Sequence, residues 1–483
     1  MKLAELLLGL DYDLVNLSED TEITSVCSDS RRVRRQSLFV CINGSRQNGH
    51  NYAQNAIANG AAAVVSEYAI DGIACVVCRD TRLANAFIWA NYFGNPQNKL
   101  NISFVTGTNG KTSTAEYLFS ILKAAGVKCG IVGTLGARTT DTVIDFRDSE
   151  IEDAPSAMTT PDPEGLYGVL SEMVRLGVKC VIMEASSHAI SQKKLAPISF
   201  DVGIFTNLSH DHLDYHKTVE NYFSAKASLF AKCKSKIICT DSEYGEKLAR
   251  EYPDAVKVSR KNAANVKLGT TGVEYDFLDM HINSSVAAEF AVENSMLAAS
   301  AALELKVPKT EIEKGISELR SISGRMEHII FSDEYGFDAY IDYAHTPAAM
   351  RSAIESVRHI AHGRALCVLF GCGGNRDREK RSIMGSIAEM LADKIIVCAD
   401  NSRDEDPADI INDILSGMKC PEYAFAIEDR EVAIEFAVRQ ALEGEVLLLL
   451  GKGHEQYEID KDGKHPFDER KILRRSAERK VNN

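Results

Sequence analysis

The sequence predicts an α/β protein of three domains built around parallel β-sheets. Its 483 residues suffice for about three domains of roughly 150 residues each. Apolar runs of strand length alternate with segments of helix length, a pattern typical of βαβ units and parallel sheets. A Gly/Pro/Asn cluster at residues 94–98 and the pair Gly324-Arg325 separate these segments. We therefore expect domains at residues 1–98, 99–324 and 325–483.

The expected strands occur in all three domains. Each is a short apolar run bounded by polar or glycine-containing segments. We expect strands at residues 37–42, 62–66 and 74–77 in the first domain, at 101–106, 180–184 and 202–207 in the second, and at 365–370, 394–399 and 446–450 in the third.

The composition is that of an ordinary globular protein with an acidic balance of charge. Apolar residues make up 45% of the chain and charged residues 26%, which excludes a disordered protein. The 55 basic and 69 acidic residues leave a net charge of −14, which argues against a protein that binds duplex nucleic acid. A polyanionic small molecule stays compatible with this charge, since a local basic pocket can lie within an acidic surface.

The sequence predicts a cytoplasmic protein that is not embedded in a membrane. The longest apolar block, Val446 to Leu450, is far shorter than the ~18–20 residues that span a bilayer. Residues 1–5 lack the apolar core of a secretory signal. The twelve cysteines are scattered, as in a cytosolic protein with reduced thiols. Cys75 and Cys78 form a Cys-x-x-Cys pair, which we expect in a buried strand rather than in a zinc or redox site.

The first chemical motif follows the strand at residues 101–106. The run from Thr106 to Thr112 reads Thr-Gly-Thr-Asn-Gly-Lys-Thr and opens an amphipathic helix. Its glycines let backbone N–H groups turn toward a phosphate at the positive end of that helix. Lys111 can bring positive charge to the outer phosphates, and the Thr112 hydroxyl can reach Mg²⁺. Val105 replaces the first glycine of the standard motif, and a glycine turn without a ligand is the alternative. We predict a nucleotide-binding loop.

Candidate metal ligands follow the next two strands of the second domain. Glu184 ends the strand at 180–184, and five further residues cluster after the strand at 202–207. Oxygen-rich ligands at the carboxyl ends of strands beside a phosphate loop suit Mg²⁺. A zinc site is less favoured because cysteine and histidine are not paired at finger spacing. For each residue alone, a capping or hydrogen-bonded loop residue is the alternative. The five clustered residues are His210, Asp211, His212, Asp214 and His216.

A lysine falls on the apolar face of the helix that follows. Val219, Tyr222 and Phe223 define this face, and Lys226 lies seven, four and three residues further along. An inward-facing ammonium is costly unless it is paired or chemically changed. One alternative is that the lysine extends to the surface. The other is that it faces the phosphate site, as a cation or as a carbamate that binds Mg²⁺.

Charged residues also follow the strands of the third domain. Asn401 and Arg403 come after the strand at 394–399, Glu455 comes after 446–450, and Arg381 begins the helix after 365–370. Because the carboxyl ends of parallel strands meet at one edge of a sheet, we expect these side chains to converge. Two arginines and a glutamate suit a zwitterion with an extra carboxylate. For Arg403 alone, a solvated salt-bridging residue is the alternative.

Together these motifs resemble the Mur ligase family, and within it the enzymes that add the third amino acid of the peptidoglycan stem peptide. The resemblance implies an N-terminal UDP-binding α/β domain, a central P-loop ATPase-like domain with a parallel sheet, and a C-terminal Rossmann-like domain. The matching segments run through nearly the whole chain in one order and are Asp29–Arg31, Thr106–Thr112, Met158–Pro161, Glu184–His188, Asn207–His216 with Lys226, Gly324–Glu327, Asp342–Pro347, Gly371–Asp377, Asp400–Arg403 and Gly451–Glu455.

The resemblance implies ATP-dependent amide synthesis by a monomer. The γ-phosphate would pass to a carboxylate of UDP-MurNAc-L-Ala-D-Glu, and an amine would attack the acyl phosphate, with catalysis by positioning and charge neutralisation. The implied catalytic residues are Lys111, Glu184, His212 and Lys226, with Thr112, Glu184, His212 and carbamylated Lys226 as Mg²⁺ ligands. The implied ATP contacts are Gly107, Thr108, Asn109, Gly110, Lys111, Thr112, Ser113, Asn294, Arg325, Asp342 and His345. The implied contacts of the uridine-linked substrate are Ser30, Thr159, Thr160, Ser186, Gln192 and Lys194.

The resemblance also bears on which amino acid is added. In the family, Asp-Asn-Pro-Arg marks the enzymes that use meso-diaminopimelate, and here the run is Asp400-Asn401-Ser402-Arg403. The arginine that can bind the distal carboxylate is present, whereas the proline that stiffens its loop is absent. We predict meso-diaminopimelate, with lysine or ornithine as alternatives, bound by Arg381, Asp400, Asn401, Arg403, Gly451 and Glu455. There are two other hypotheses about function. The protein is a related ligase such as folylpolyglutamate synthetase, or it is a nucleotide-binding scaffold without activity.

Overall fold

The computed structural model describes residues 1–44, 47–144, 158–269, 271–331 and 335–481. The chain folds into two compact units, each assembled from several segments. The first comprises Met1–Thr106, Gly126–Ile204 and Ser224–Lys236, and the second comprises Gly107–Ala125, Phe205–Phe223 and Ile237–Asn483.

The N-terminal part of the first unit is a five-stranded sheet in the order β1-β5-β4-β3-β2. Strands β2 to β5 run parallel, and β1 pairs antiparallel with β5 at the edge. Phe39, Val64 and Cys75 are buried in its core, and Cys78 is buried just beyond β5, so the predicted buried strand is confirmed. The elements are α1 (Leu3–Leu6), β1 (Asp13–Val15), β2 (Ser25–Cys27), β3 (Ser37–Val40), α2 (Ala53–Ala58), β4 (Ala61–Ser66), β5 (Cys75–Val77) and α3 (Thr81–Tyr92).

A second sheet has eight strands in the order β13-β12-β11-β6-β10-β7-β8-β9. Strand β10 lies parallel between β6 and β7, and β8 and β9 continue as antiparallel strands to the edge. The strands are β6 (Asn101–Thr106), β7 (Cys129–Gly133), β8 (Gly136–Thr139), β9 (Val143–Ile144), β10 (Cys180–Glu184), β11 (Phe200–Phe205), β12 (Cys233–Cys239) and β13 (Val256–Val258). The helices between them are α4 (Lys111–Ala124), α5 (Pro163–Arg175), α6 (Ser187–Ser191), α7 (Leu213–His216), α8 (Val219–Ala227) and α9 (Glu243–Glu251).

In the second unit, helix α4 packs against two helices from later in the chain, α10 and α11. A three-stranded antiparallel sheet, β14-β15-β16, precedes these helices. The elements are β14 (Ala264–Gly269), β15 (Gly272–Phe277), β16 (Met280–Ser284), α10 (Glu289–Glu304) and α11 (Lys309–Glu318).

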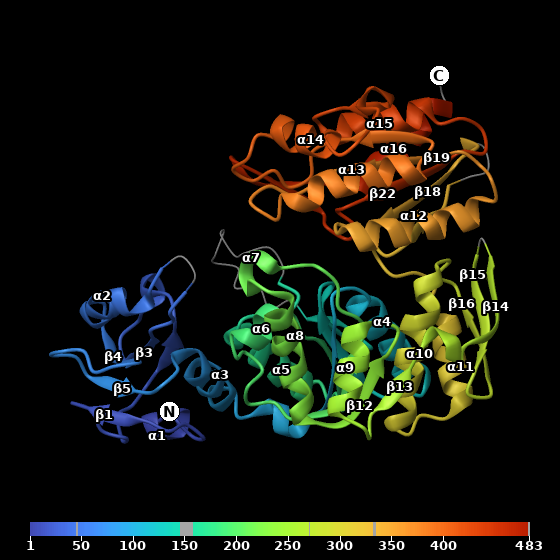
Figure 1. Cartoon of the computed structure of the whole chain (residues 1–483). Coiled ribbons are helices and arrows are strands. Elements are labelled where there is room, and N and C mark those ends of the chain that lie inside the picture. The colour runs from blue at the N-terminus through green and yellow to red at the C-terminus, as the bar shows by residue number, and fades with distance from the viewer. Residues whose placement is uncertain (45–46, 145–157, 270, 332–334, 482–483) are drawn as a thin grey trace. The chain divides into compact units, whose positions relative to one another are not determined.

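The C-terminal part of the second unit is a six-stranded sheet in the order β17-β18-β22-β19-β20-β21, parallel except for β17 (orange to red in Figure 1). Helices α15 and α16 cover the face that carries Ile341, Leu369 and Leu449, and α12 contacts β19 and β22. The elements are β17 (Glu327–Ile329), β18 (Asp338–Asp342), α12 (Pro347–Ala361), β19 (Leu366–Phe370), α13 (Glu379–Leu391), β20 (Lys394–Val397), α14 (Pro407–Leu415), β21 (Ala424–Ala426), α15 (Arg430–Gln440), β22 (Val446–Leu450), β23 (Tyr457–Asp460), β24 (Gly463–Pro466) and α16 (Glu469–Val481).

The predicted α/β fold class is confirmed, and each predicted strand is present with its ends shifted by no more than two residues. The sequence analysis missed the hairpin strands β7 to β9 and β14 to β16. Strand β9 has only two residues and β14 buries none of its side chains, so no apolar run of strand length marks them. Among the described residues, no helix combines the length and the apolar character needed to cross a bilayer.

Candidate active site

The phosphate loop lies between β6 and α4, as the sequence predicts, and two of its positions require glycine. Gly107 and Gly110 adopt φ angles of 152° and 81°. A Cβ on Gly107 would lie 1.9 Å from Oγ1 of Thr206, and one on Gly110 would lie 2.4 Å from Oδ1 of Asn294. Only the missing side chain lets this backbone pass so close to its neighbours.

The residues after β11 fix the shape of this loop. The N–H of Asn109 donates to Oδ1 of Asn207 at 3.0 Å, and the hydroxyl of Thr206 donates to the Asn109 carbonyl at 2.6 Å. Nζ of Lys111 donates to the carbonyl oxygens of Gly107 and Thr108 at 3.1 and 2.7 Å. The lysine therefore lies over the loop at the N-terminus of α4, where an anion is favoured.

Two of the residues predicted to contact ATP lie against helix α4. Oδ1 of Asn294 accepts a hydrogen bond from the Thr114 hydroxyl at 3.3 Å, and Asn294 is buried. Nη2 of Arg325 donates to Oγ1 of Thr112 at 3.1 Å. The Arg325 guanidinium also lies over the Tyr343 ring, 4.6 Å from its centroid.

Asp342 and His345, the other two predicted ATP contacts, make hydrogen bonds to nearby backbone. The buried carboxylate of Asp342 accepts from the N–H groups of Met326 and Ala344 at 2.7 and 2.8 Å. Nδ1 of His345 lies 2.9 Å from the Tyr343 carbonyl and must carry the proton, because a carbonyl only accepts. Burial, helped by the charge of Lys380, lowers the pKa of His345, so the ring is neutral at pH 7.

The predicted cluster after β11 places a carboxylate among positive charges. Burial alone would raise the pKa of Asp211, but the charges of His212, Lys380 and Lys111 lower it overall. Nε2 of His212 lies 3.4 Å from Oδ2 of Asp211. Asp211 is thus held ionised within a set of cations, which is the environment of a phosphate or metal site.

The remaining members of that cluster lie in different settings. Nε2 of His210 lies 3.5 Å from Oδ2 of Asp377, and both side chains are partly exposed. His216 is buried, with its ring 5.1 Å from that of Tyr222. The side chain of Asp214 lies outside the described part of the chain.

Within the first unit, Glu184 and three of the predicted substrate residues form one hydrogen-bonded cluster. Glu184 is 1% exposed, and its two carboxylate oxygens accept from the N–H and the hydroxyl of Thr134 at 2.9 and 3.0 Å. The Thr134 hydroxyl also donates to Oγ1 of Thr159 at 3.2 Å. Oγ1 of Thr160 donates to the Glu184 carbonyl at 2.8 Å and accepts from the Ser186 N–H at 3.1 Å. The structure therefore brings these predicted residues together.

Gln192, Lys194 and Ser30 lie in the same unit without a hydrogen bond to this cluster in the described contacts. Lys194 is 5% exposed, and its Nζ lies 2.7 Å from Oδ1 of Asp162. Gln192 caps the C-terminal end of α6. Ser30 opens a short 3₁₀ helix, Ser30–Arg32, at the end of which Arg32 forms a bidentate pair with Glu164 of α5.

Lys226 faces inward, as the helical pattern predicts. It lies in the last turn of α8 and is 1% exposed. The alternative in which this side chain extends to the surface is therefore wrong. A buried, long-armed lysine is the kind of group whose amine chemistry is altered by its surroundings.

The charged loops of the third predicted domain converge at the carboxyl edge of the six-stranded sheet. The Gly374 N–H donates to the Asn401 carbonyl at 2.9 Å, which joins the loops after β19 and β20. Nδ2 of Asn401 donates to Oε2 of Glu455 at 2.9 Å, which joins the loops after β20 and β22. The predicted convergence is confirmed, and Asp406 caps α14 with Pro407 in its first turn.

Arg403 lies between these loops in a strained conformation. Its φ of 53° is uncommon for a residue with a side chain, and its Nη1 donates to the carbonyls of Gly374 and Asn401 at 2.9 and 3.1 Å. Burial, together with the charge of Arg376, lowers its pKa. Two arginines in proximity favour a ligand that carries carboxylates.

Arg381 is buried among acidic side chains, and Arg376, which the sequence analysis did not single out, lies near Arg403. Arg381 is 0% exposed, with Nη1 at 3.0 and 2.9 Å from carboxylate oxygens of Glu405 and Asp413. These bonds lower the pKa of Glu405 to about 2. Arg381 thus braces the loop, whereas Cγ of Arg376 and Nη1 of Arg403 both lie beside Gly373. The proximity of Arg376 to Arg403 depends on the fold, and no local pattern signals it.

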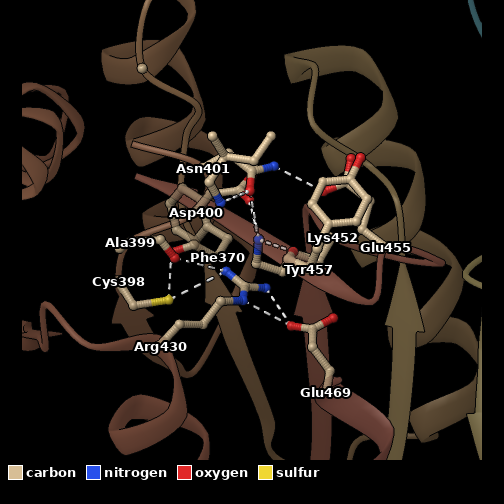
Figure 2. Close-up of polar contacts among 12 residues, drawn as sticks. Phe370, Cys398, Ala399, Asp400, Asn401, Arg430, Lys452, Glu455, Tyr457 and Glu469 are labelled. Carbon is tan, nitrogen blue, oxygen red and sulfur yellow. Dashed lines mark hydrogen bonds and ion pairs between the residues drawn. The ribbon is translucent and has the colours of Figure 1, made fainter. Parts of the chain in front are cut away.

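Two acidic side chains, Asp400 and Glu455, also lie at this edge (Figure 2). Burial and the charge of Asp400 raise the pKa of Glu455. Burial would raise the pKa of Asp400 as well, but the charges of Lys452 and Arg430 lower it overall. A Cβ on Gly451 would lie 3.1 Å from Oδ2 of Asp400, so Gly451 brings the backbone close to this carboxylate.

The comparisons with known proteins agree with this architecture. The chain matches the models of the Mur ligase family catalytic domain at residues 22–81, the Mur ligase middle domain at 105–302, and the Mur ligase glutamate ligase domain at 324–453. It is 35% identical to UDP-N-acetylmuramoyl-L-alanyl-D-glutamate--2,6-diaminopimelate ligase of Clostridium perfringens, over 98% of this chain and 99% of that protein. It is 37% identical to the protein of the same name from Caldanaerobacter subterraneus, over 98% of each chain.

Solved structures show the same likeness in three dimensions. A structure of UDP-N-acetylmuramoyl-L-alanyl-D-glutamate--2,6-diaminopimelate ligase superposes with a TM-score of 0.67, at 26% identity over 99% of each chain. MurF ligase from Thermotoga maritima in complex with ADP superposes with a TM-score of 0.62, at 16% identity over 96% of this chain and 98% of that one, and shares the fold. The resemblance read from the motifs is thus confirmed, and the chain belongs to the Mur ligase family.

Proposed function

We propose that this protein is an ATP-dependent ligase that joins meso-2,6-diaminopimelate to UDP-N-acetylmuramoyl-L-alanyl-D-glutamate. The observation that carries the proposal is the carboxyl edge of the C-terminal sheet, where the charges of Arg376, Asp400 and Glu455 all act on Arg403. This pattern complements an amino acid with two carboxylates and an ammonium. The full-length relatives named for this reaction support the same assignment.

The phosphate loop supports ATP as the phosphoryl donor. The loop leads into the N-terminus of α4, where backbone N–H groups favour an anion, and Lys111 supplies a cation there. We assign Arg325 to the outer phosphates as well, since its guanidinium already lies at Thr112. We assign Asn294, which lies beside Gly110, to the nucleotide as well.

The donor set also suits Mg²⁺, which prefers oxygen ligands. We assign the ion to the Thr112 hydroxyl, the buried carboxylate of Glu184, the His212 imidazole and Lys226 as a carbamate. Carbamylation converts the buried cation of Lys226 into an anion, which removes the cost of an inward ammonium and supplies an oxygen ligand. When bound, Mg²⁺ offsets the negative charge of the reacting phosphate and carboxylate.

The proposed reaction is a phosphoryl transfer followed by amide formation. The substrate carboxylate attacks the γ-phosphate of ATP, which releases ADP and forms an acyl phosphate. The amine of the amino acid then attacks the acyl carbon, which forms the amide and releases phosphate. Lys111 and Arg325 neutralise the charges that must approach one another. We assign Thr159, Thr160 and Ser186 to holding the uridine-linked peptide beside Glu184.

We propose diaminopimelate rather than lysine or ornithine because its distal carboxylate can pair with the positive charge of Arg403. Arg403 lies in a half-buried site where burial already lowers its pKa, so an unpaired guanidinium there is costly. Diaminopimelate supplies a distal carboxylate to this arginine, whereas lysine and ornithine do not.

Phosphate release from ATP tests the proposal. Release by the purified enzyme with Mg²⁺ is expected only when UDP-MurNAc-L-Ala-D-Glu and meso-diaminopimelate are both present. Equal release with a folate and glutamate would overturn the assignment, as would nucleotide binding without any amide product.

A further inference from the structure

Lys452 is a buried lysine at the carboxyl end of β22 to which the proposed reaction gives no role. The side chain is 0% exposed. Its Nζ donates to Oδ1 of Asn401 at 3.0 Å and to the Tyr457 carbonyl at 3.1 Å, and it lies 3.3 Å from Oδ1 of Asp400. An ammonium without water is costly, so its three oxygen partners are what keep it in place.

The contacts of Lys452 determine which way the carboxamide of Asn401 points. An ammonium and a backbone N–H can only donate hydrogen bonds. Nζ of Lys452 and the N–H of Ile459 approach the same atom of Asn401, both at 3.0 Å, so this atom must be the carbonyl oxygen Oδ1. The NH₂ group is thereby turned to Glu455, where it donates to Oε2 at 2.9 Å (Figure 2).

The loops that carry these residues are tied together by a second buried cation, Arg430. Its guanidinium donates to the carbonyl oxygens of Leu450 and Ala399 at 2.8 and 3.3 Å, the residues just before Gly451 and Asp400. Arg430 thus sets the spacing of the two loops. Lys452 can therefore act on the orientation of the Asn401 side chain, while Arg430 holds the backbones of the two loops at their spacing.

We propose that Lys452 is a positioning residue for the amino-acid substrate. By holding Oδ1 of Asn401, it keeps the amide NH₂ on Glu455 and so fixes the carboxylate that receives the substrate ammonium. Without Lys452, Oδ1 of Asn401 keeps only the N–H of Ile459 as a donor, so the carboxamide and its NH₂ group are held less firmly on Glu455. The inference rests on the proposed function, because it assigns to Glu455 the ammonium of the amino acid that this function brings to the sheet edge.

Steady-state kinetics of Lys452→Met test this role. The KM for diaminopimelate is expected to rise at least tenfold, while the KM values for ATP and for UDP-MurNAc-L-Ala-D-Glu stay within about twofold. Lys394→Met is the matched control. Lys394 also pairs with a carboxylate, that of Glu445, but it lies at the start of β20, whereas Asn401 follows the end of β20. Its KM for diaminopimelate should not change. An unchanged KM in folded Lys452→Met would overturn the inference.

A double-mutant cycle separates positioning from general structural damage. If Lys452 acts through Asn401, then Lys452→Met combined with Asn401→Ala should raise the KM for diaminopimelate by no more than about twofold beyond Asn401→Ala alone. If the double variant instead raises this KM by the product of the two single-variant increases, the proposal is contradicted. Wild-type enzyme that releases no phosphate with diaminopimelate would refute the proposed function itself, whereas an active wild type with an unaffected Lys452→Met would refute the positioning role alone.

If Lys452→Met does not fold, Asn401→Asp tests the same role. This variant keeps a side-chain oxygen for Lys452 to bind. One oxygen stays on Lys452, and the other replaces the NH₂ group that faces Glu455. Two carboxylates at that distance share a proton, so the pH dependence of the KM for diaminopimelate should shift to higher pH. An unchanged profile would show that the NH₂ group does not face Glu455. The groups that surround Glu455 are Asp400, Asn401, Lys452, Arg403, Tyr343 and Tyr457.

Discussion

The substitution Arg430→Met tests how the edge of the C-terminal sheet is held together. Arg430 of α15 and Glu469 of α16 are both 0% exposed, and Nη2 of Arg430 lies 2.7 Å from Oε1 of Glu469. Removal of the arginine leaves a buried carboxylate without its counter-charge, which typically costs about 3–5 kcal/mol of folding free energy. The carbonyls of Leu450 and Ala399 lose a donor as well.

Hydrogen exchange of peptides from β20 and β22 measures this loss locally. The sequence contains one tryptophan, Trp89, which lies in α3 of the first unit, so its fluorescence does not report on this sheet. A loss of about 3–5 kcal/mol corresponds to exchange that is roughly 150- to 5,000-fold faster in Arg430→Met. Replacing both partners, in Arg430→Met with Glu469→Leu, should recover much of the protection, because no buried charge is then left alone.

Arg475→Met provides the matched control for this pair. Arg475 of α16 bonds Glu431 of α15 at 2.5 Å, so it joins the same two helices, but both side chains are more than two-fifths exposed. Such a pair contributes about 0–1 kcal/mol, and exchange should accelerate by at most about fivefold. Equal acceleration in Arg430→Met and Arg475→Met would refute the reasoning.

Three further substitutions probe the proposed site. Lys226→Ala should lower kcat at least a hundredfold with partial rescue by short carboxylic acids, and full activity in a turnover assay would rule out a carbamate ligand. Gly110→Ala should weaken the binding of an ATP analogue, measured by calorimetry, by roughly tenfold or more. The reason is that the positive φ at this position costs an alanine about 1–2 kcal/mol and that the new Cβ meets Asn294. An unchanged affinity would contradict the phosphate-loop geometry. Arg403→Ala should raise the KM for diaminopimelate by about 10- to 150-fold, for a charged hydrogen bond of about 1.5–3 kcal/mol. An equal rise in the KM for ATP would count against its role.

The sequence reveals those features that depend on local patterns. Strand β22 is a continuous apolar run and strands β6 and β10 are mainly apolar, and the limits of all three agree with the prediction. The inward position of Lys226 follows from helical spacing alone and is confirmed. The glycines of the phosphate loop are recognisable because their backbone geometry tolerates no side chain.

Features that depend on distant contacts could not be predicted. Arg381 and Arg376 lie five residues apart in one segment, and their different settings depend on Glu405 and Asp413, which come from the next loop and helix. Sequence spacing does not show which arginine turns inward. The role of Lys452 likewise depends on its contact with Asn401, which comes from a different loop.

The mass of the product tests the central assignment most directly. The enzyme is incubated with ATP, Mg²⁺ and UDP-MurNAc-L-Ala-D-Glu in the presence of meso-diaminopimelate, L-lysine or L-ornithine, each supplied separately. We expect a UDP-MurNAc-tripeptide whose mass includes diaminopimelate, with little or no product from the other two amino acids. A product formed preferentially from lysine or ornithine would contradict the pairing of Arg403 with a distal carboxylate.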